Sequence, residues 1–204
     1  MASLVTNRGK LGQFLNDLGL VGTAVEVGVF RGHFAGELLA HWRGQQLILV
    51  DPWRHLEDYL DSWNLSDAEM ERNYRITLET LSRFQERIRI LRMRSEEAAP
   101  LIPDDSCDFI YIDANHAYEA VKRDLQLWFP KLRVGGVMSG HDYFDAIADA
   151  QLEPIRDDNK SLSKQVLTSY GVKTAVDEFA ASLGARLFVT SEHEPTWYFI
   201  KQRS

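Results

Sequence analysis

The sequence predicts an α/β fold with a seven-stranded, mostly parallel sheet, helices on both faces and a C-terminal antiparallel hairpin. Short apolar segments alternate with segments of helical periodicity, which is the pattern of parallel β-α-β units. Only residues 191–195 separate the last two apolar segments. That connection is too short for a parallel crossover, so these two strands should pair as a hairpin at one edge of the sheet. At 204 residues the chain is expected to form a single domain, residues 1–204.

The predicted strands are short apolar runs bounded by turn residues. Glycines follow the first run, an acid closes the second, and the turn at residues 103–106 precedes the fourth. We interpret Gly135 and Gly136 as a turn that leads into the fifth strand. In chain order the strands are expected at residues 24–29, 46–50, 88–93, 107–112, 134–138, 186–190 and 196–201.

The predicted helices are recognised by apolar residues three or four apart and by their boundary residues. Gly19 and Gly44 end the first two helices, Ser66 opens a capping box, and Pro130 ends a later helix. Ser95 is expected to cap a short helix. The longer helices are expected at residues 10–19, 34–42, 118–129 and 172–183.

Composition narrows the classes of partner. The formal net charge of −7 and the isoelectric point near 5.4 argue against nucleic acid, because proteins that bind it usually carry a basic face. No apolar run reaches membrane-spanning length, and the N-terminus lacks the apolar core of a signal peptide. We therefore expect a cytoplasmic protein with no membrane partner. The single cysteine, Cys107, lies in an apolar strand and is expected to be a buried thiol.

The most informative motif lies within residues 25–51. Glu26, Gly28 and Gly32 form an E-x-G-x-x-x-G pattern after the first strand, and Asp51 closes the second strand. Glycine lets the backbone approach a ligand closely, and a carboxylate at a strand end can accept hydrogen bonds from a ribose diol. Because ligands of such sheets bind outside the carboxyl ends of the strands, the motif predicts a site for a nucleoside-bearing cofactor.

Further motifs follow in order along the chain. They read Tyr-Ile-Asp-Ala-Asn-His-Ala-Tyr at 111–118, Leu-x-x-Gly-Gly at 132–136 and Gly-His-Asp-Tyr at 140–143. Together with the first motif they resemble the class I S-adenosylmethionine-dependent methyltransferases, over residues 20–201. Within that family the chain is similar to the small O-methyltransferases related to macrolide-sugar and catechol-type enzymes. The resemblance implies the Rossmann-like methyltransferase fold.

The resemblance also implies S-adenosylmethionine as the cofactor. Glu26 and Gly28 would lie against its amino-acid part, and Asp51 would accept hydrogen bonds from its ribose. Arg94 and Ser95 would flank the adenine, although many relatives carry Asp where Arg94 stands. The implied cofactor-binding residues are Glu26, Gly28, Gly32, Asp51, Arg94, Ser95 and Asp113.

Methyl transfer to a hydroxyl requires alignment of the acceptor and removal of its proton by a base or a Lewis-acidic metal. In metal-dependent relatives, an acid after strand four and a pair of residues after strand five hold a divalent ion. Asp113 matches the acid, and His141 with Asp142 match the pair, so these three are the predicted metal ligands. His116 is a further candidate base. The predicted catalytic residues are Asp113, His116, His141 and Asp142.

Two polar and aromatic segments, residues 54–87 and 143–171, are predicted to cover a small-molecule acceptor. The second should order when the acceptor binds. Their aromatic residues could form an apolar wall for a ring, or could pack against the sheet or against a second copy of the chain in a homo-oligomer. Tyr143 is the favoured acceptor contact. The aromatic residues considered are Trp53, Tyr59, Trp63, Tyr143 and Phe144.

Two other classes of function fit parts of the pattern. A nicotinamide-dependent oxidoreductase shares the first β-α-β unit, but its glycine motif would need a glycine where Glu26 stands. A non-catalytic S-adenosylmethionine-binding protein would keep Glu26, Gly28 and Asp51 but would not need the polar residues after strands four and five. Those residues favour an enzyme.

Overall fold

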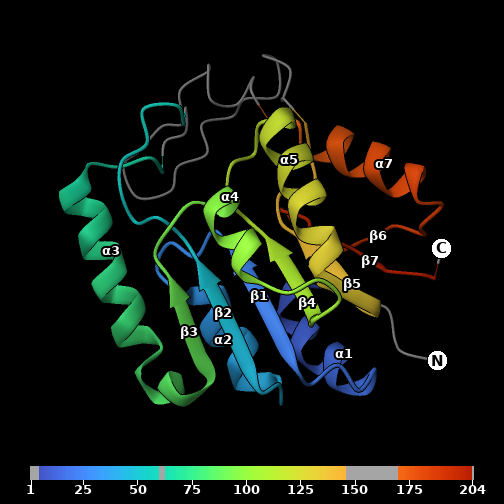
Figure 1. Cartoon of the computed structure of the whole chain (residues 1–204), viewed down its shortest axis with the longest axis horizontal. Coiled ribbons are helices and arrows are strands. Elements are labelled where there is room, and N and C mark those ends of the chain that lie inside the picture. The colour runs from blue at the N-terminus through green and yellow to red at the C-terminus, as the bar shows by residue number, and fades with distance from the viewer. Residues whose placement is uncertain (1–4, 60–62, 146–169, 204) are drawn as a thin grey trace.

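A computed structural model describes residues 5–59, 63–145 and 170–203 of the chain. The strands within these residues are β1 Thr23–Val27, β2 Gln46–Val50, β3 Ile88–Leu91, β4 Cys107–Ile112, β5 Leu132–Gly140, β6 Phe188–Val189 and β7 Trp197–Ile200. They form a seven-stranded sheet in the order β3-β2-β1-β4-β5-β7-β6 (Figure 1). Strands β1 to β5 pair in parallel, whereas β7 runs antiparallel to both β5 and β6. The predicted fold class and C-terminal hairpin are confirmed.

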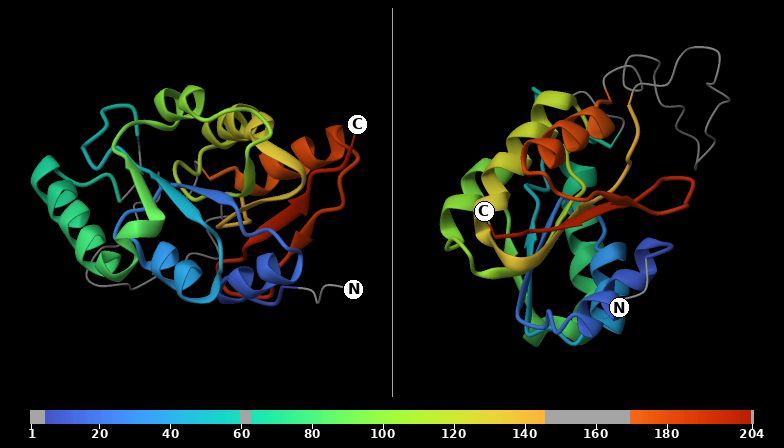
Figure 2. Two further views of the ribbon diagram at one scale, coloured as in Figure 1. Left: turned by 60° about the horizontal axis from the view of Figure 1, so that its bottom comes forward. Right: turned by 90° about the vertical axis from the view of Figure 1, so that its right-hand side faces the viewer.

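Helices cover both faces of this sheet, as the two views of Figure 2 show. The described α-helices are α1 Leu11–Asp17, α2 His33–His41, α3 Asp67–Thr80, α4 Ser95–Ala98, α5 Tyr118–Trp128 and α7 Val172–Ser182. Alternation of side chains along each strand decides which layer they face. In β2, Ile48 and Val50 join the core beneath α4, α5 and α7, whereas Leu47 and Leu49 join the core beneath α1 and α2.

Several predicted boundaries differ from the structure, and three of them have a clear physical cause. Strand β1 ends at Val27 because Gly28 turns the backbone with φ of +88°. The interpretation of Gly135 and Gly136 as a turn before the fifth strand is wrong, because both lie inside β5, where its pairing with β4 shifts register. Ser95 does not cap α4. The N-cap is Arg94, whose backbone N–H donates to Glu97 at 2.9 Å.

Two further sequence predictions are confirmed. Ser66 and Glu69 form the capping box at the start of α3. Cys107 is fully buried in β4, and burial raises the pKa of its thiol to about 11, so it is an inert core residue. In the part of the chain that the structure describes, no helix has the length and apolarity needed to cross a membrane.

Candidate functional site

A cavity of about 510 Å³ opens at the carboxyl ends of β1, β2, β4 and β5. Its size falls in the range of small-molecule sites, and its position is the switch point where the strand order reverses between β1 and β4. All but one of the predicted site residues line it. The predicted residues that line it are Glu26, Gly28, Asp51, Arg94, Ser95, Asp113, His116, His141 and Asp142.

Asp51 ties the end of β2 to the loop that follows β1. Its Oδ2 accepts from the backbone N–H of Val29 at 2.9 Å and of Phe30 at 3.0 Å, and its Oδ1 accepts from Trp53 at 2.7 Å. Burial raises the pKa of Asp51 in spite of these bonds. A carboxylate has about four lone-pair sites, so one remains for a ligand hydroxyl.

Three non-glycine residues at the strand ends adopt left-handed backbone conformations. The φ angle is +53° at Phe30, +42° at Trp53 and +52° at Asp142. Each such residue costs on the order of 1–3 kcal/mol and persists only where its surroundings hold it. The Phe30 carbonyl, for example, accepts from Trp53 Nε1 at 2.8 Å and from Thr77 Oγ1 at 2.9 Å. Of the four described non-glycine residues with such a φ angle, three thus lie at this end of the sheet, and the fourth, Asp105, lies in the turn before β4.

The two motif glycines have different neighbours. A Cβ on Gly28 would lie 1.9 Å from the carbonyl oxygen of Asp113, so this glycine lets the ends of β1 and β4 meet. Gly32, with φ of +73°, lies against α3 instead, because a Cβ there would be 3.1 Å from Cγ2 of Thr77. Gly32 is not among the residues that line the cavity. The structure thus gives Gly32 a role in packing α2 against α3.

Glu26 presents an unsatisfied carboxylate oxygen to the cavity. The residue is 2% exposed, and its buried Oε2 has no hydrogen-bond partner among the described residues. Burial, with the charges of Asp113 and Asp51 nearby, raises the pKa of Glu26 well above its usual range. Such a buried orphan acceptor is costly unless a donor arrives with a ligand. A cationic amine is the group that would satisfy it best.

A second polar group at the cavity links α4 to α5. The Ser95 hydroxyl donates to the carboxylate of Asp124 and accepts from Trp128 Nε1 at 2.8 Å. Asp124 also lines the cavity, beside Arg94. The Arg94 guanidinium donates two hydrogen bonds to the Asp58 carboxylate, from Nη1 to Oδ2 at 2.9 Å and from Nη2 to Oδ1 at 2.7 Å. Both residues line the cavity.

Asp124 should make stability depend on pH. Burial raises its pKa from 3.8 to about 6, so between these values the folded state holds a proton that the unfolded chain has released. Stability contributed by this group is therefore lost as pH rises from about 4 to about 6, by up to about 3 kcal/mol. Denaturant unfolding should show that the free energy of unfolding of Asp124→Asn rises relative to that of the wild type as pH increases across this window. The exposed Asp104→Asn should follow the wild type, and a parallel course for all three proteins would contradict the prediction.

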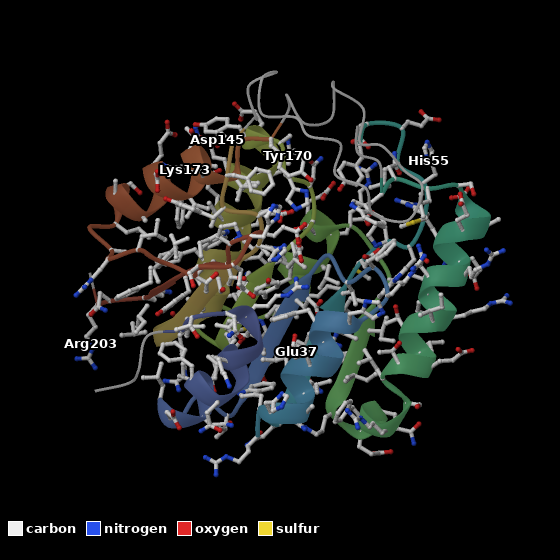
Figure 3. The ribbon with its side chains drawn as sticks, turned by 180° about the vertical axis from the view of Figure 1, so that it is seen from behind. Glu37, His55, Asp145, Tyr170, Lys173 and Arg203 are labelled. Atoms are coloured by element: carbon white, nitrogen blue, oxygen red, sulfur yellow. The ribbon has the colours of Figure 1, made fainter. Side chains whose placement is uncertain are left out.

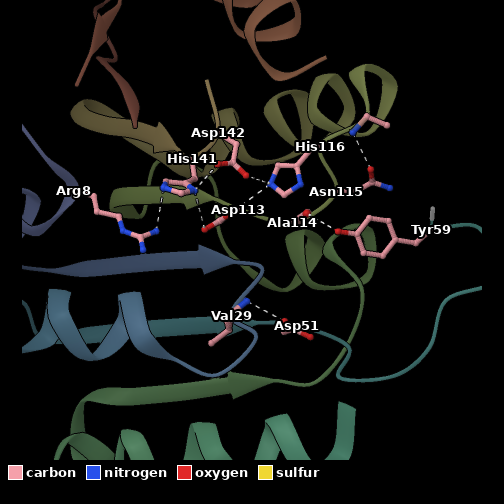
Figure 4. Close-up of polar contacts among 11 residues, drawn as sticks. Arg8, Val29, Asp51, Tyr59, Asp113, Ala114, Asn115, His116, His141 and Asp142 are labelled. Carbon is pink, nitrogen blue, oxygen red and sulfur yellow. Dashed lines mark hydrogen bonds and ion pairs between the residues drawn. The ribbon is translucent and has the colours of Figure 1, made fainter. Parts of the chain in front are cut away.

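Four predicted catalytic residues, from the ends of β4 and β5, form one polar cluster: Asp113, His116, His141 and Asp142 (Figure 4). His116 Nε2 lies between two carboxylates, 3.4 Å from Asp113 Oδ1 and 3.2 Å from Asp142 Oδ2. His141 Nδ1 lies 2.9 Å from Asp142 Oδ1 and 4.0 Å from Asp113 Oδ2.

Neighbouring groups shift the pKa values of His141 and Asp142 in the polar cluster. Burial by itself lowers the pKa of His141, but the hydrogen bond to Asp142 and the charge of Asp113 outweigh it and raise that pKa. Burial opposes ionisation of Asp142, yet its contact with His141 and the charge of His116 lower its pKa. Asp142 is therefore an ionised acceptor at neutral pH.

The aromatic residues considered as acceptor contacts divide into two groups. Tyr59 and Trp63 line the cavity, and the Tyr59 hydroxyl donates to the carbonyl of Ala114 at 3.1 Å. Trp53 is fully buried and belongs to the core. The Tyr143 hydroxyl donates to Asp177 of α7, and Tyr143 does not line the cavity. The favoured acceptor contact is therefore not at the site in this structure.

Residues 146–169, most of the predicted covering segment 143–171, lie outside the described residues. The two described ends of that segment lie side by side, with an antiparallel bridge between Asp145 and Gly171 (Figure 3). The Tyr170 ring stacks between Phe144 and His116, with ring centroids 5.1 and 4.7 Å apart. These contacts attach both ends of the segment to the polar cluster.

Arg8 and Asp124 are two charged residues among the cavity residues that sequence reasoning missed. Arg8 lies 133 residues before His141, and its Nη1 is 3.1 Å from His141 Nε2. Asp124 is in the middle of α5, and the sequence predicts that an acidic residue at such a position on a largely polar helix is exposed. No local signal could have found either residue, because only the packing of distant segments brings them to the cavity.

Comparison with known proteins agrees with this geometry. A family model described as a methyltransferase domain matches residues 25–143, more than half of the chain. None of the curated proteins matches the chain.

Solved structures share the fold at low identity. A Staphylococcus aureus protein assigned as a caffeoyl-CoA O-methyltransferase has a TM-score of 0.66 at 16% identity, over 98% of this chain and 86% of its own. A Bacillus cereus O-methyltransferase in complex with S-adenosylhomocysteine has a TM-score of 0.57 at 14% identity. The match covers 98% of this chain and 83% of that chain. The O-methyltransferase TomG from Streptomyces achromogenes, in complex with S-adenosylmethionine, has a TM-score of 0.56 at 14% sequence identity. The match covers 98% of this chain and 82% of that chain.

The family match spans the motif after β1, the acid after β2 and the polar residues after β4 and β5, which are the elements that build the cavity. The chain belongs to the methyltransferase-domain family, and it is a class I S-adenosylmethionine-dependent methyltransferase.

Proposed function

We propose that this enzyme transfers the methyl group of S-adenosylmethionine to a hydroxyl of a small-molecule acceptor. The observation that carries the proposal is that the polar cluster and the unsatisfied Oε2 of Glu26 line one cavity. The unsatisfied Glu26 oxygen suits the amino group of the cofactor, and the remaining lone pair of Asp51 suits its ribose. The O-methyltransferases with the same fold support a hydroxyl as acceptor.

The cofactor supplies an electrophilic methyl group on sulfur, and the protein must align and deprotonate the hydroxyl that receives it. His116 is the proposed base. Asp113 and Asp142 flank its Nε2 and stabilise the imidazolium that forms when the ring accepts the acceptor's proton. Tyr170 stacks on the ring at 4.7 Å and restricts its orientation. The segments 54–87 and 143–171 are proposed to cover the acceptor, with Tyr59 and Trp63 facing it.

A divalent ion is the second candidate for activating the hydroxyl. Ligand atoms of Asp113, His141 and Asp142 lie within 4.8 Å of one another, which favours it. Bound there, an ion would act as a Lewis acid on the acceptor oxygen. As arranged here, however, the donor set fits poorly, because His141 Nδ1 lies 2.9 Å from Asp142 Oδ1, in a contact that occupies the nitrogen facing the two carboxylates. The two carboxylates suit an ion, and the histidine does not.

Calorimetry tests the cofactor assignment. S-adenosylhomocysteine should bind in the micromolar range, about −8 kcal/mol. Asp51→Ala should weaken binding by about 1–2 kcal/mol, because the ribose loses a charged acceptor. Asp17→Ala, an exposed change on α1, is the matched control and should bind as the wild type does. Binding of NAD in place of S-adenosylhomocysteine would overturn the assignment and restore the oxidoreductase alternative.

Turnover tests the acceptor class. Release of S-adenosylhomocysteine should accompany methylation of one or more members of a panel of phenols, catechols and sugars. Tight cofactor binding with no methylated product from any hydroxyl compound would favour the non-catalytic alternative or an acceptor of another class.

A further inference from the structure

The N-terminal segment places one arginine beside the polar cluster. The Val5 N–H donates to the Tyr198 hydroxyl at 3.3 Å, and the Arg8 N–H donates to Glu192 Oε2 at 2.9 Å. Both partners belong to the β6–β7 hairpin region. The Arg8 side chain then reaches His141 at the end of β5, as Figure 4 shows. The backbone anchors therefore fix where this guanidinium lies.

The contact between Arg8 and His141 determines which ring nitrogen carries the hydrogen. A guanidinium only donates hydrogen bonds, so Nε2 of His141, 3.1 Å from Arg8 Nη1, must be the acceptor. The hydrogen of the neutral ring is then on Nδ1, which lies 2.9 Å from Asp142 Oδ1. Two N–H donors cannot face each other at 3.1 Å, so this contact leaves Nε2 as the acceptor and places the ring hydrogen on Nδ1.

This arrangement conflicts with a metal ion at His141. The nitrogen that faces Asp113 and Asp142 is Nδ1, and an ion there needs the lone pair of Nδ1. The ring hydrogen would have to move to Nε2, where it would meet an N–H of Arg8. An ion would also place a second cation near the guanidinium, in a partly buried site where charge repulsion is strong.

We propose that Arg8 is the resident cation of this site: it holds His141 as the Nδ1–H donor to Asp142 and excludes a divalent ion from Asp113, His141 and Asp142. Arg8 is thus a positioning residue, because it acts through His141. The inference rests on the proposed function only in taking the polar cluster as the catalytic site. It separates the two candidate routes, since a site that contains Arg8 uses its own side chains for proton removal.

The first experiment measures Mn²⁺ binding to the full-length protein by calorimetry. Wild-type protein should bind Mn²⁺ weakly, and Arg8→Met, which keeps an apolar stem of similar length, should bind it at least about tenfold more tightly. Arg54→Met, which removes another cavity arginine, should match the wild type. Equal Mn²⁺ affinity in the wild type and Arg8→Met, with both folded by circular dichroism, would overturn the proposal.

The second measurement is the tautomer itself. Long-range ¹H–¹⁵N spectra of the wild type should show His141 with its hydrogen on Nδ1 and none on Nε2. In Arg8→Met, Nε2 no longer faces a guanidinium and should carry a hydrogen in part of the molecules, while Asp142 keeps the hydrogen on Nδ1. An Nε2–H form in the wild type would also overturn the proposal. Binding of S-adenosylhomocysteine to the wild type is tested separately, so a failure of the proposed function can be distinguished from a failure of the Arg8 inference.

Discussion

Replacing His116 by alanine is expected to lower the turnover number by about 10²- to 10⁴-fold, the usual contribution of a positioned general base. His116 Nε2 lies within 3.4 Å of two carboxylates, so the ring is held ready to accept a proton and its charged form is stabilised. Affinity for S-adenosylhomocysteine should change little. Steady-state release of S-adenosylhomocysteine with a methylated phenol, catechol or sugar provides the measurement. His41→Ala, an exposed histidine of α2, serves as the control.

Two companion measurements separate the base from the metal route. Asp113→Asn should lose more turnover than cofactor affinity, because Asp113 stabilises the imidazolium. A chelator should leave turnover unchanged if the base route operates. Loss of activity with a chelator, restored by added metal, would establish the divalent ion as the activating group instead. An unaltered rate in His116→Ala, together with insensitivity to chelation, would leave Asp113 as the base.

Gly28→Ala is expected to lower the free energy of unfolding by roughly 3 kcal/mol or more, because two costs combine. The φ angle of +88° disfavours any residue with a Cβ, and that Cβ would lie 1.9 Å from the Asp113 carbonyl oxygen. Relief of the clash must separate the ends of β1 and β4, so binding of S-adenosylhomocysteine should also weaken. Denaturant unfolding and calorimetry measure the two effects.

The matched control is Gly135→Ala. Gly135 has a similar φ of +81°, but nothing lies within 4 Å of the position its Cβ would occupy. It therefore carries the backbone cost of about 1 kcal/mol without the clash. Equal destabilisation of Gly28→Ala and Gly135→Ala would show that the close approach between β1 and β4 contributes nothing.

Much of the cavity could be predicted because its residues follow strand ends. Glu26, Asp51, Asp113 and Asp142 each come at or just after the end of an apolar strand, and the carboxyl ends of parallel strands meet at one edge. The order of motifs was sufficient to identify the family. Strand boundaries do not follow from local patterns: Gly135 falls inside β5 because the pairing of β4 with β5 contains a register shift that no local pattern reveals.

The sequence by itself determined the α/β class, the C-terminal hairpin, the motif after the first strand and the residues of the polar cluster, since each follows from local spacing. Tertiary structure alone decided that Gly32 packs against α3, that Tyr143 turns to α7, and that Arg8 and Asp124 enter the cavity. These outcomes depend on contacts between segments far apart in the chain. Periodicity and turn chemistry act over a few residues, so they carry no information about which distant side chain will neutralise a buried acid or fix the tautomer of a histidine.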